Sequence, residues 1–210
     1  VFLAGHVQIA LLSLVAVGAY AIYLLAIRPP QHHLALWLAG AVLAGLALAG
    51  AQLLPTLELT ALSERAGGLD ASFFTSFSLH PLYLVSLLSP YIRGEVYPEL
   101  SVELVGYVGL LPLLLSALAI LDWLSARWSR RRRRSARPND GAPESPNARR
   151  TVPFFSLLAL FSLGCIFGTP VYALVYALPL LKQSHSPFRW VFPLTLAVAI
   201  LAGVGAEALK

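Results

Sequence analysis

The sequence predicts an all-α protein, a polytopic bundle of about five transmembrane helices, on three observations. Hydrophobic residues make up 58% of the chain and charged residues 12%, with a mean hydropathy of +0.73, whereas an ordinary soluble domain is about a quarter charged. Five stretches without Asp, Glu, Lys, Arg or His are long enough to cross the hydrocarbon core. Charged residues gather between these stretches. Because backbone groups in lipid must be satisfied within the segment, helices are the expected form.

The predicted spans are joined by loops of very different length. The spans cover residues 7–27, 34–57, 104–121, 152–169 and 190–206. Residues 28–33 are so few that the first two spans must form a tight antiparallel hairpin. Residues 55–103 then form a long, partly ordered loop. Residues 122–151 form a loop in which a run rich in Arg, Ser, Pro, Asn and Gly predicts disorder.

The segment after the fourth span is apolar but too long to belong to that span. Pro170 predicts a break in the helix. A short helix in the membrane interface is expected to follow, with Tyr172 and Tyr176 on one face because they are four residues apart. A buried loop is the alternative.

The distribution of charge predicts the orientation of the chain. Nine of the fifteen Lys and Arg residues lie within 122–151, and five of them form the run 130–134. Loops dense in Lys and Arg stay on the cytoplasmic side during insertion. Residues 122–151 and 28–33 are therefore predicted to be cytoplasmic, and residues 55–103 and 170–189 to lie outside. Six of the ten acidic residues fall in the first of these external segments.

The tryptophans agree with this orientation. Trp37, Trp123 and Trp128 fall near the predicted inner headgroups and Trp190 near the outer ones, where indole rings prefer to lie. The lipid bilayer is thus the first expected partner. The net charge of +5 comes almost entirely from the Arg-rich loop between two spans, so no nucleic-acid partner is expected. The first interpretation of that loop is a topological role. A second interpretation is attraction to anionic lipid, which contributes about 1 kcal/mol per Arg near the surface.

Small residues and a single cysteine complete the description of the spans. The second span is rich in Gly and Ala, including Gly40, Gly45 and Gly50, and Gly164 lies in the fourth. Small residues allow helices to approach closely, so they predict tight packing. Cys165 is the only cysteine, which excludes an internal disulfide and a metal-binding cysteine pair.

Two features predict that the chain is a fragment of a longer protein. It contains no Met, even at position 1, and it opens almost directly into a span. We therefore expect the remaining segments of the full-length protein to act together with this chain.

A series of short motifs occurs along the chain in a characteristic order. They are His6 beside Gly5 with Gln8, residues 52–59 (QLLPTLEL), 77–81 (FSLHP), 89–91 (SPY), 107–109 (YVG), 168–172 (GTPVY) and 186–190 (SPFRW). In this order and spacing they resemble the YfhO-like bacterial membrane proteins. The resemblance covers nearly the whole chain, and it depends on the order of the motifs because each motif is short.

The resemblance implies a glycosyltransferase of the integral-membrane GT-C type in the bacterial cytoplasmic membrane. Such a protein moves a sugar from a polyprenyl-phosphate donor to an acceptor on the outer face. Its principal acidic catalytic residue lies in the first external loop, after the first span. No segment of this chain matches that loop, so the main base is expected in the remaining segments.

Several residues at the predicted outer face suit this chemistry. Transfer from a lipid phosphate needs a carboxylate to accept a proton and cations to stabilise the departing phosphate. Glu58 is the candidate catalytic carboxylate, with a solvated or helix-terminal carboxylate as the alternative. The candidate lipid-phosphate site consists of Lys182, His185 and Arg189, although such side chains also extend to headgroup phosphates. The candidate substrate contacts are His6, Gln52 and His80, of which the two histidines could equally cap helices.

No cofactor is identified, and a divalent metal is the one to consider. Glu95, Glu99 and Glu103 recur every four residues and would form an acidic stripe on a helix that could hold such a cation. Pro98 interrupts the stripe and disfavours the helix. The metal-ligating residues therefore stay unknown.

Two other classes of function compete with the enzyme. A transporter, channel or flippase subunit usually places polar side chains or broken helices near the midplane. None of the five spans has a charged centre, and Pro112 is the one irregularity expected near a midplane. A noncatalytic membrane scaffold is the other alternative. We rank the enzyme first, the scaffold second and the transporter third.

Overall fold

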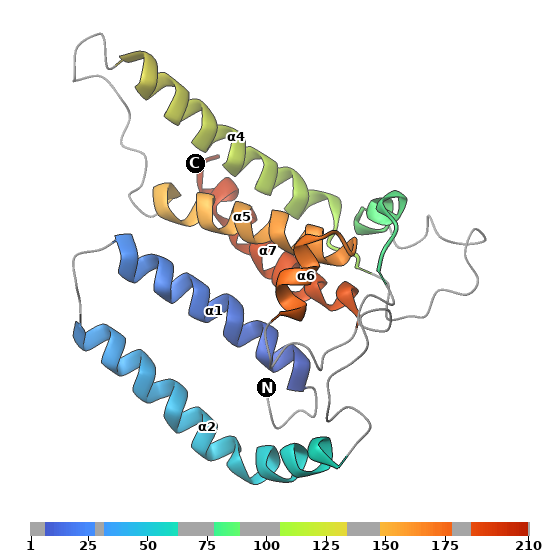
Figure 1. Cartoon of the computed structure of the whole chain (residues 1–210). Helices are drawn as coiled ribbons and strands as arrows, with labels where there is room; N and C mark the ends of the chain where they lie inside the picture. Colours follow the sequence, from blue (N-terminus) through green and yellow to red (C-terminus); the bar gives the residue numbers. More distant parts are fainter. Residues whose placement is uncertain are drawn as a thin grey trace.

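The computed structural model describes residues 7–27, 32–62, 78–88, 106–133, 148–177 and 186–209. These residues form helices and connecting turns without any strand, so the all-α prediction is confirmed (Figure 1). The elements are α1 (Val7–Ile27), α2 (His32–Ala61), the 3-10 helix η2 (Pro81–Leu87), α4 (Leu110–Arg133), α5 (Ala148–Ile166), α6 (Val171–Tyr176), the 3-10 helix η5 (Pro187–Trp190) and α7 (Val191–Glu207).

Four of these helices are long and apolar enough to cross a membrane. They contain the candidate spans Gln8–Ile27, Ala35–Leu59, Leu110–Ser129 and Pro187–Glu207. The remaining predicted span corresponds to α5, whose apolar part, Arg150–Ile166, is shorter. Length and composition therefore identify a helical membrane protein with roughly five spans.

The core of the bundle lies where α4 and α5 pack on α7. Its largest cluster includes Leu12 of α1 and Leu194 and Val198 of α7. A second cluster joins Ala119, Val152 and Phe155 to α7. α1 packs along α7 and α5 (Figure 1). α7 thus has neighbours on several sides, which explains why half of its most apolar stretch is buried.

The contact between α4 and α7 is close because a glycine and a serine lie in it. A Cβ atom at Gly205 would overlap the carbonyl oxygen of Leu115 and lie 2.8 Å from its carbonyl carbon. Oγ of Ser116 lies 2.9 Å from the carbonyl oxygen of Val198 and 2.7 Å from that of Pro112, so its one hydrogen can be donated to either or shared between them. Small and hydroxyl-bearing residues are the usual means of close helix approach in membranes.

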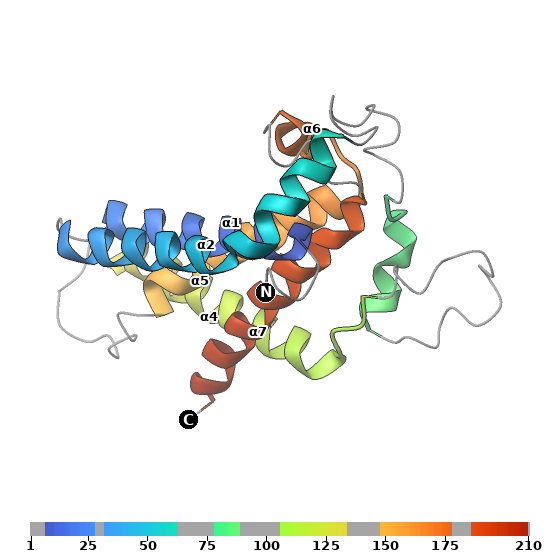
Figure 2. The same cartoon turned by 90° about the horizontal axis from the view of Figure 1, so that it is seen from below.

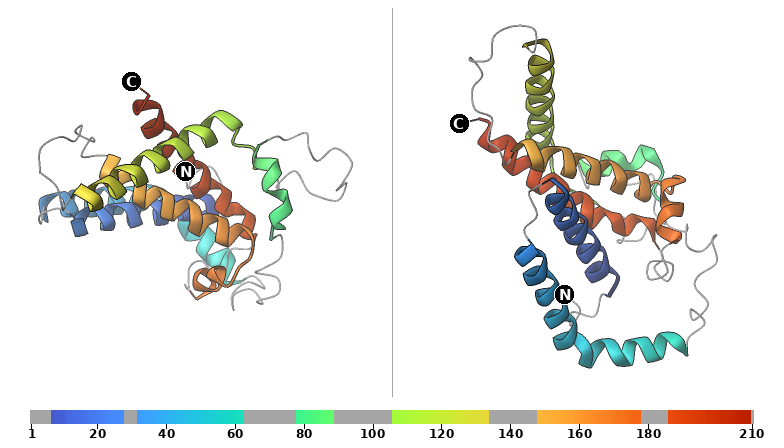
Figure 3. Two further views of the ribbon diagram at one scale, coloured as in Figure 1. Left: turned by 90° about the horizontal axis from the view of Figure 1, so that it is seen from above. Right: turned by 60° about the vertical axis from the view of Figure 1, so that its left-hand side comes forward.

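α2 stands apart from this core. Only 6% of its most apolar stretch is buried, and its ribbon bends before the C-terminal part (Figures 2 and 3). Pro55 lies inside the helix and lacks the N–H that would bond one turn back, which accounts for a bend. A Cβ atom at Gly40, Gly45 or Gly50 would meet nothing within 4 Å. The tight packing predicted from these small residues of α2 is therefore absent among the described residues.

Several helix boundaries differ from those predicted. The third span was expected to begin at 104, but α4 begins at Leu110, after Gly109 with φ of 93°. Pro112 consequently lies in the first helical turn, where proline is tolerated, and is no midplane irregularity. α2 continues through Pro55 to Ala61, so the first part of segment 55–103 is helical.

The Arg-rich segment is also more ordered than expected where it is described. α4 continues to Arg133, and α5 already begins at Ala148, so disorder predicted for residues 122–133 and 148–151 is wrong. Arg is a good helix former, and a helix that has already been nucleated in the apolar part extends at little cost. Cations are also favourable at a helix C-terminus.

The helix ends fall into two groups at opposite ends of the molecule. The end of α1, the start of α2, the end of α4 and the start of α5 lie at one end, which we call the basic end (Figure 1). The start of α1, η2, the start of α4, the end of α5, α6 and η5 lie at the other, which we call the polar-motif end (Figure 1). Figure 3 shows the same separation for α4, α5 and α6. The two groups alternate along the chain, and which end faces the cytoplasm stays a prediction.

Single-cysteine labelling tests which end is cytoplasmic. Cys165 is fully buried, and its replacement by Ser leaves a chain without cysteine. With single Cys residues at Ser72, Ser135 or Ser184, we expect a membrane-impermeant maleimide to label positions 72 and 184 in intact cells but not position 135. Labelling at 135 alone would reverse the orientation. Labelling after permeabilisation is the control for accessibility.

Candidate functional site

Arg189 is the centre of the candidate site and projects from a short, firmly packed turn. Its neighbours Phe188 and Trp190 are buried, and the Trp190 ring meets Phe161 of α5 edge-on, with centroids 5.1 Å apart. Ser186 begins the turn with φ of 72°, and its carbonyl oxygen accepts from the Arg189 N–H at 3.1 Å. Two buried aromatic rings thus hold the backbone, while the Arg189 side chain is only half-buried.

The Arg189 guanidinium bonds to a residue far away in the sequence. Its Nη1 donates a hydrogen bond to Oε1 of Gln8, in the first turn of α1. An amide carries no net charge, so this contact orients the cation without neutralising it. Among the described residues, no Asp or Glu forms an ion pair with Arg189.

Tyr172 of α6 adds a buried phenol to the same region. Its side chain is 1% exposed, and its N–H bonds to the carbonyl oxygen of Thr169 at 2.8 Å. Burial raises the pKa of the Tyr172 hydroxyl, and the positive charge of Arg189 partly opposes that shift. Tyr172 is therefore a neutral phenol at physiological pH, within electrostatic reach of the guanidinium.

The segment 78–80 is fastened to the end of α5. The N–H of Leu79 donates to the carbonyl oxygen of Ile166 at 2.9 Å, and the Leu79 side chain is buried in the core. Gly168 turns the chain with φ of 62°, and a Cβ atom there would overlap Oγ of Ser78. His80 follows this junction and is exposed.

The segment 106–109 closes the polar-motif end from another side. The N–H groups of Val108 and Gly109 both donate to the carbonyl oxygen of Leu87, at 3.1 and 3.2 Å. A Cβ atom at Gly106 would come within 2.9 Å of Val191 and 3.1 Å of Phe188. Parts of five of the motifs found in the sequence, those containing Gln8, His80, Gly109, Tyr172 and Arg189, therefore meet at one end of the bundle.

Two of the remaining candidate residues, Glu58 and Gln52, are not brought to Arg189. Glu58 and Gln52 are exposed on α2, whose C-terminal part is well separated from α6 and η5 in Figure 1. The carbonyl oxygen of Gln52 accepts from the Thr56 hydroxyl at 2.8 Å, a bond within the helix. His6, Lys182 and His185 lie outside the described residues, as does the stripe of Glu95, Glu99 and Glu103. In the described part, no three His, Cys, Asp or Glu residues are grouped as metal ligands.

The pairing of Gln8 with Arg189 was not predicted. A polar residue in the first turn of an otherwise apolar span is the signal that could have indicated it. Arg189 could not be identified from the sequence as the partner of Gln8, because 181 positions separate the two residues. Only the packing of α1 against the start of α7 brings them together.

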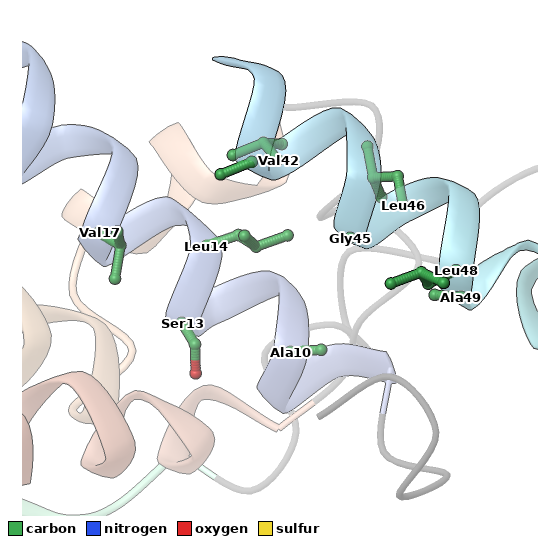
Figure 4. A pocket seen from close by; sticks show the side chains of 10 residues that line it. Ala10, Ser13, Leu14, Val17, Val42, Gly45, Leu46, Leu48 and Ala49 are labelled. Carbon is green, nitrogen blue, oxygen red and sulfur yellow. The ribbon is translucent and has the colours of Figure 1, made fainter. Parts of the chain in front are cut away.

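A second feature is an apolar cavity of about 450 Å³ between α1 and α2 (Figure 4). It is lined by side chains such as Leu14 and Val17 of α1 and Val42 and Leu46 of α2. Ser13 contributes the one hydroxyl of its lining, and that hydroxyl donates to the Ile9 carbonyl oxygen of its own helix at 2.9 Å. The cavity therefore has the chemistry of a hydrocarbon site.

The chain was compared with protein-family models, curated proteins and solved structures, and none of them matches it.

Proposed function

We propose that this chain is part of a membrane glycosyltransferase-like protein that binds a polyprenyl-phosphate sugar donor, with Arg189 as the ligand of the lipid phosphate. The supporting observation is the half-buried Arg189 guanidinium at the polar-motif end, oriented by Gln8. The donor's sugar would be transferred to an acceptor on the outer face of a bacterial cytoplasmic membrane.

The partial burial of the Arg189 guanidinium and its several N–H donors support an anionic ligand. Guanidinium has five N–H donors, and among the described residues Gln8 accepts from one of them. Moving a cation partly out of water is costly unless an anion compensates it. Phosphate fits the remaining donors because two of its oxygens match the fork of the guanidinium. Lys182 and His185, close in sequence, would add further positive charge to this site.

The general base of the proposed reaction has less support than the phosphate ligand Arg189. Glu58 remains the candidate in this chain, although α2 carries it away from Arg189 in Figure 1. An acidic residue in the remaining segments of the full-length protein is the other source. The proposal therefore gives this chain the phosphate-binding part of the reaction, with His6, Gln52 and His80 as further substrate contacts.

The cavity between α1 and α2 bears on the alternative functions. Its lining offers a polar substrate no side-chain hydrogen-bond donor, because the Ser13 hydroxyl already donates its hydrogen within α1 and only its oxygen can still accept. It suits a hydrocarbon chain, as a lipid donor requires, and disfavours passage of a free sugar through that space. A noncatalytic scaffold that holds the lipid without turnover is the second candidate, ahead of a transporter or flippase subunit.

Substitution of Arg189 in the full-length protein tests the proposal. We expect Arg189→Ala to weaken binding of a polyprenyl phosphate by about tenfold or more, since hydrogen bonds to charged groups contribute about 1.5–3 kcal/mol. Arg189→Lys keeps the charge but loses the forked donor geometry. Its affinity for polyprenyl phosphate should therefore lie between those of the unsubstituted protein and of Arg189→Ala. Binding is measured by equilibrium dialysis with radiolabelled polyprenyl phosphate in detergent, and transfer by release of the labelled sugar.

Two further variants make this test specific. Arg127→Ala removes a cation at the basic end, where it lies over the Trp123 ring, and should leave donor binding unchanged. Gln8→Glu places a carboxylate against Arg189 and should weaken binding by competing with the phosphate. Equal effects of the Arg189 and Arg127 substitutions would refute the assignment. Binding without transfer in the full-length protein would favour the scaffold.

A further inference from the structure

We propose that η2 inserts an apolar surface into the hydrocarbon of the leaflet at the polar-motif end, with lipid acyl chains as its partner. This surface, the η2 surface, consists of Leu84 and Val85 of η2 and of Leu88, the residue after it. It lies within residues 55–103, which the sequence placed in an external loop. The proposal uses no residue of the Arg189 site and does not depend on the proposed function.

The polarity of η2 is the reverse of that of a helix on a water-exposed surface. Its three outward aliphatic side chains, Leu84, Val85 and Leu88, are between 39% and 45% exposed, whereas Ser86 is 2% exposed. Positions 85 and 88 share one row of a 3-10 helix, and the Leu88 N–H donates to the Val85 carbonyl oxygen at 3.0 Å. An element in water usually buries its aliphatic side chains and exposes its hydroxyl. Exposed apolar patches mark protein or membrane contacts.

η2 is fastened to the bundle at both ends. On one side, the Leu79 N–H donates to the Ile166 carbonyl oxygen. On the other, the Leu87 carbonyl oxygen accepts from the two residues that directly precede α4, and the Leu87 side chain packs partly against the core. η2, the short green helix, therefore lies beside the start of α4 (Figures 1 and 2). The η2 surface thus has a fixed position relative to that helix.

The start of α4 identifies lipid as the neighbour of this surface. Leu110, Leu111 and Leu114 are exposed, and they open the candidate span Leu110–Ser129. A helix of this length and composition crosses the hydrocarbon core, so its exposed leucines face acyl chains. Because η2 is bonded to the residues just before Leu110, the η2 surface continues the lipid-facing side of α4.

The polar side chains nearby suit the boundary of the hydrocarbon. Within the described residues 78–88 and 106–121 there is no Asp, Glu, Lys or Arg, so no charge has to be desolvated. The exposed polar side chains of these two segments are those of Ser78, His80 and Tyr107. Tyrosine rings are enriched where hydrocarbon meets water. The η2 surface is therefore expected at the outer part of one leaflet, below the headgroups.

A segment of this chain would fit the η2 surface less well than lipid. Residues 89–105, which connect η2 to α4, lie outside the described residues and contain Arg93, Glu95, Glu99 and Glu103. Covering an apolar surface with this segment would bring its charges near side chains that cannot compensate them, which is costly. Acyl chains carry no such penalty.

Collision accessibility of spin labels tests the proposal in the full-length protein. In the Cys165→Ser background, nitroxides are attached to Val85→Cys, Leu88→Cys, Leu111→Cys or Glu207→Cys, and the protein is reconstituted in phosphatidylcholine liposomes. Oxygen concentrates in hydrocarbon, whereas a nickel chelate stays in water. We expect the ratio of oxygen to nickel accessibility at positions 85 and 88 to match that at 111. It should exceed severalfold the ratio at 207, an exposed charged position at the end of α7.

Two results would overturn the proposal. A ratio at 85 and 88 like that at 207 would place η2 in water, and low accessibility to both reagents would mean that protein covers the surface. Quenching of Val85→Trp by brominated phosphatidylcholine is a second measurement without a spin label, and absence of quenching would also contradict insertion. Arg189→Ala should change neither readout, so failure here is distinguishable from failure of the phosphate site.

Discussion

Gly205→Ala is expected to destabilise the bundle severely although the substitution adds a single methyl group. The new Cβ atom would overlap the Leu115 carbonyl oxygen, and a backbone atom cannot rotate away. α4 and α7 would have to separate, which would also strain the bond from Ser116 to the Val198 carbonyl oxygen. Overpacking of a well-packed contact costs about 1–3 kcal/mol. Because the overlap is with a backbone atom, we expect the free energy of unfolding to fall by an amount at or above the top of that range.

Gly203→Ala is the matched control for this prediction. The two glycines lie two residues apart in α7, but a Cβ atom at Gly203 meets nothing within 4 Å. Ala exceeds Gly in helix propensity by up to about 1 kcal/mol, so the control should be neutral or stabilising. The readouts are the melting temperature in detergent and the rate at which a thiol reagent reaches Cys165, which is buried in the native bundle. Equal melting temperatures for both variants would contradict the close contact between α4 and α7.

Gly168→Val should have the next largest effect on stability, for two additive reasons. The residue has φ of 62°, a conformation that costs a β-branched residue roughly 1–3 kcal/mol. Its Cβ atom would also overlap Oγ of Ser78. We expect loss of the junction between segment 78–80 and the end of α5, which lowers the melting temperature and, through Tyr172, weakens ligand binding at Arg189.

The two causes can be separated experimentally. Gly168→Asn tolerates the left-handed backbone, so it should retain mainly the steric penalty, and Ser78→Gly should relieve part of that penalty in the double variant. A coupling energy measured from the four melting curves reports the contact itself. Gly164→Ala is the neutral control, because its Cβ atom would make ordinary contacts of 3.4 Å with Thr169 and 3.6 Å with Val171. Additive effects of the Gly168→Asn and Ser78→Gly changes would rule out the contact.

Local signals predicted the helices well where the apolar run was long and poorly where a turn depended on packing. α1 was predicted at both boundaries, because an uncharged stretch of 21 residues has one stable form in lipid. The start of α4 was placed six residues too early, at 104 in place of Leu110. Residues 106–109 are uncharged, as is the start of the helix that follows, so the absence of charged residues cannot distinguish them. Their conformation depends on the Leu87 carbonyl oxygen that accepts their N–H groups.

The site was predicted in part. Arg189 was identified as a phosphate ligand from its charge and position, and that role stays a prediction. Gln8 was noticed in a motif without a role, and Tyr172 was expected on an interfacial face but is buried. Glu58 and Arg189 were both assigned to the outer side from the sequence. That assignment gives the side of the membrane but not the distance between the two residues. They are separated because α2 stands apart from the core (Figure 1), and the position of α2 depends on which helices pack against it.

The sequence by itself determined that the chain is a helical membrane protein and roughly where its helices run, because the cost of exposing backbone and charge to hydrocarbon acts on each segment separately. Only the tertiary structure decided which glycines form contacts, leaving Gly205 crowded and Gly45 open. It also decided that Gln8 orients Arg189. The physical reason is that dispersion and hydrogen bonding act over a few ångströms. They therefore depend on which helices become neighbours, and lipid, as apolar as the helix surfaces, provides no comparable local signal for that choice.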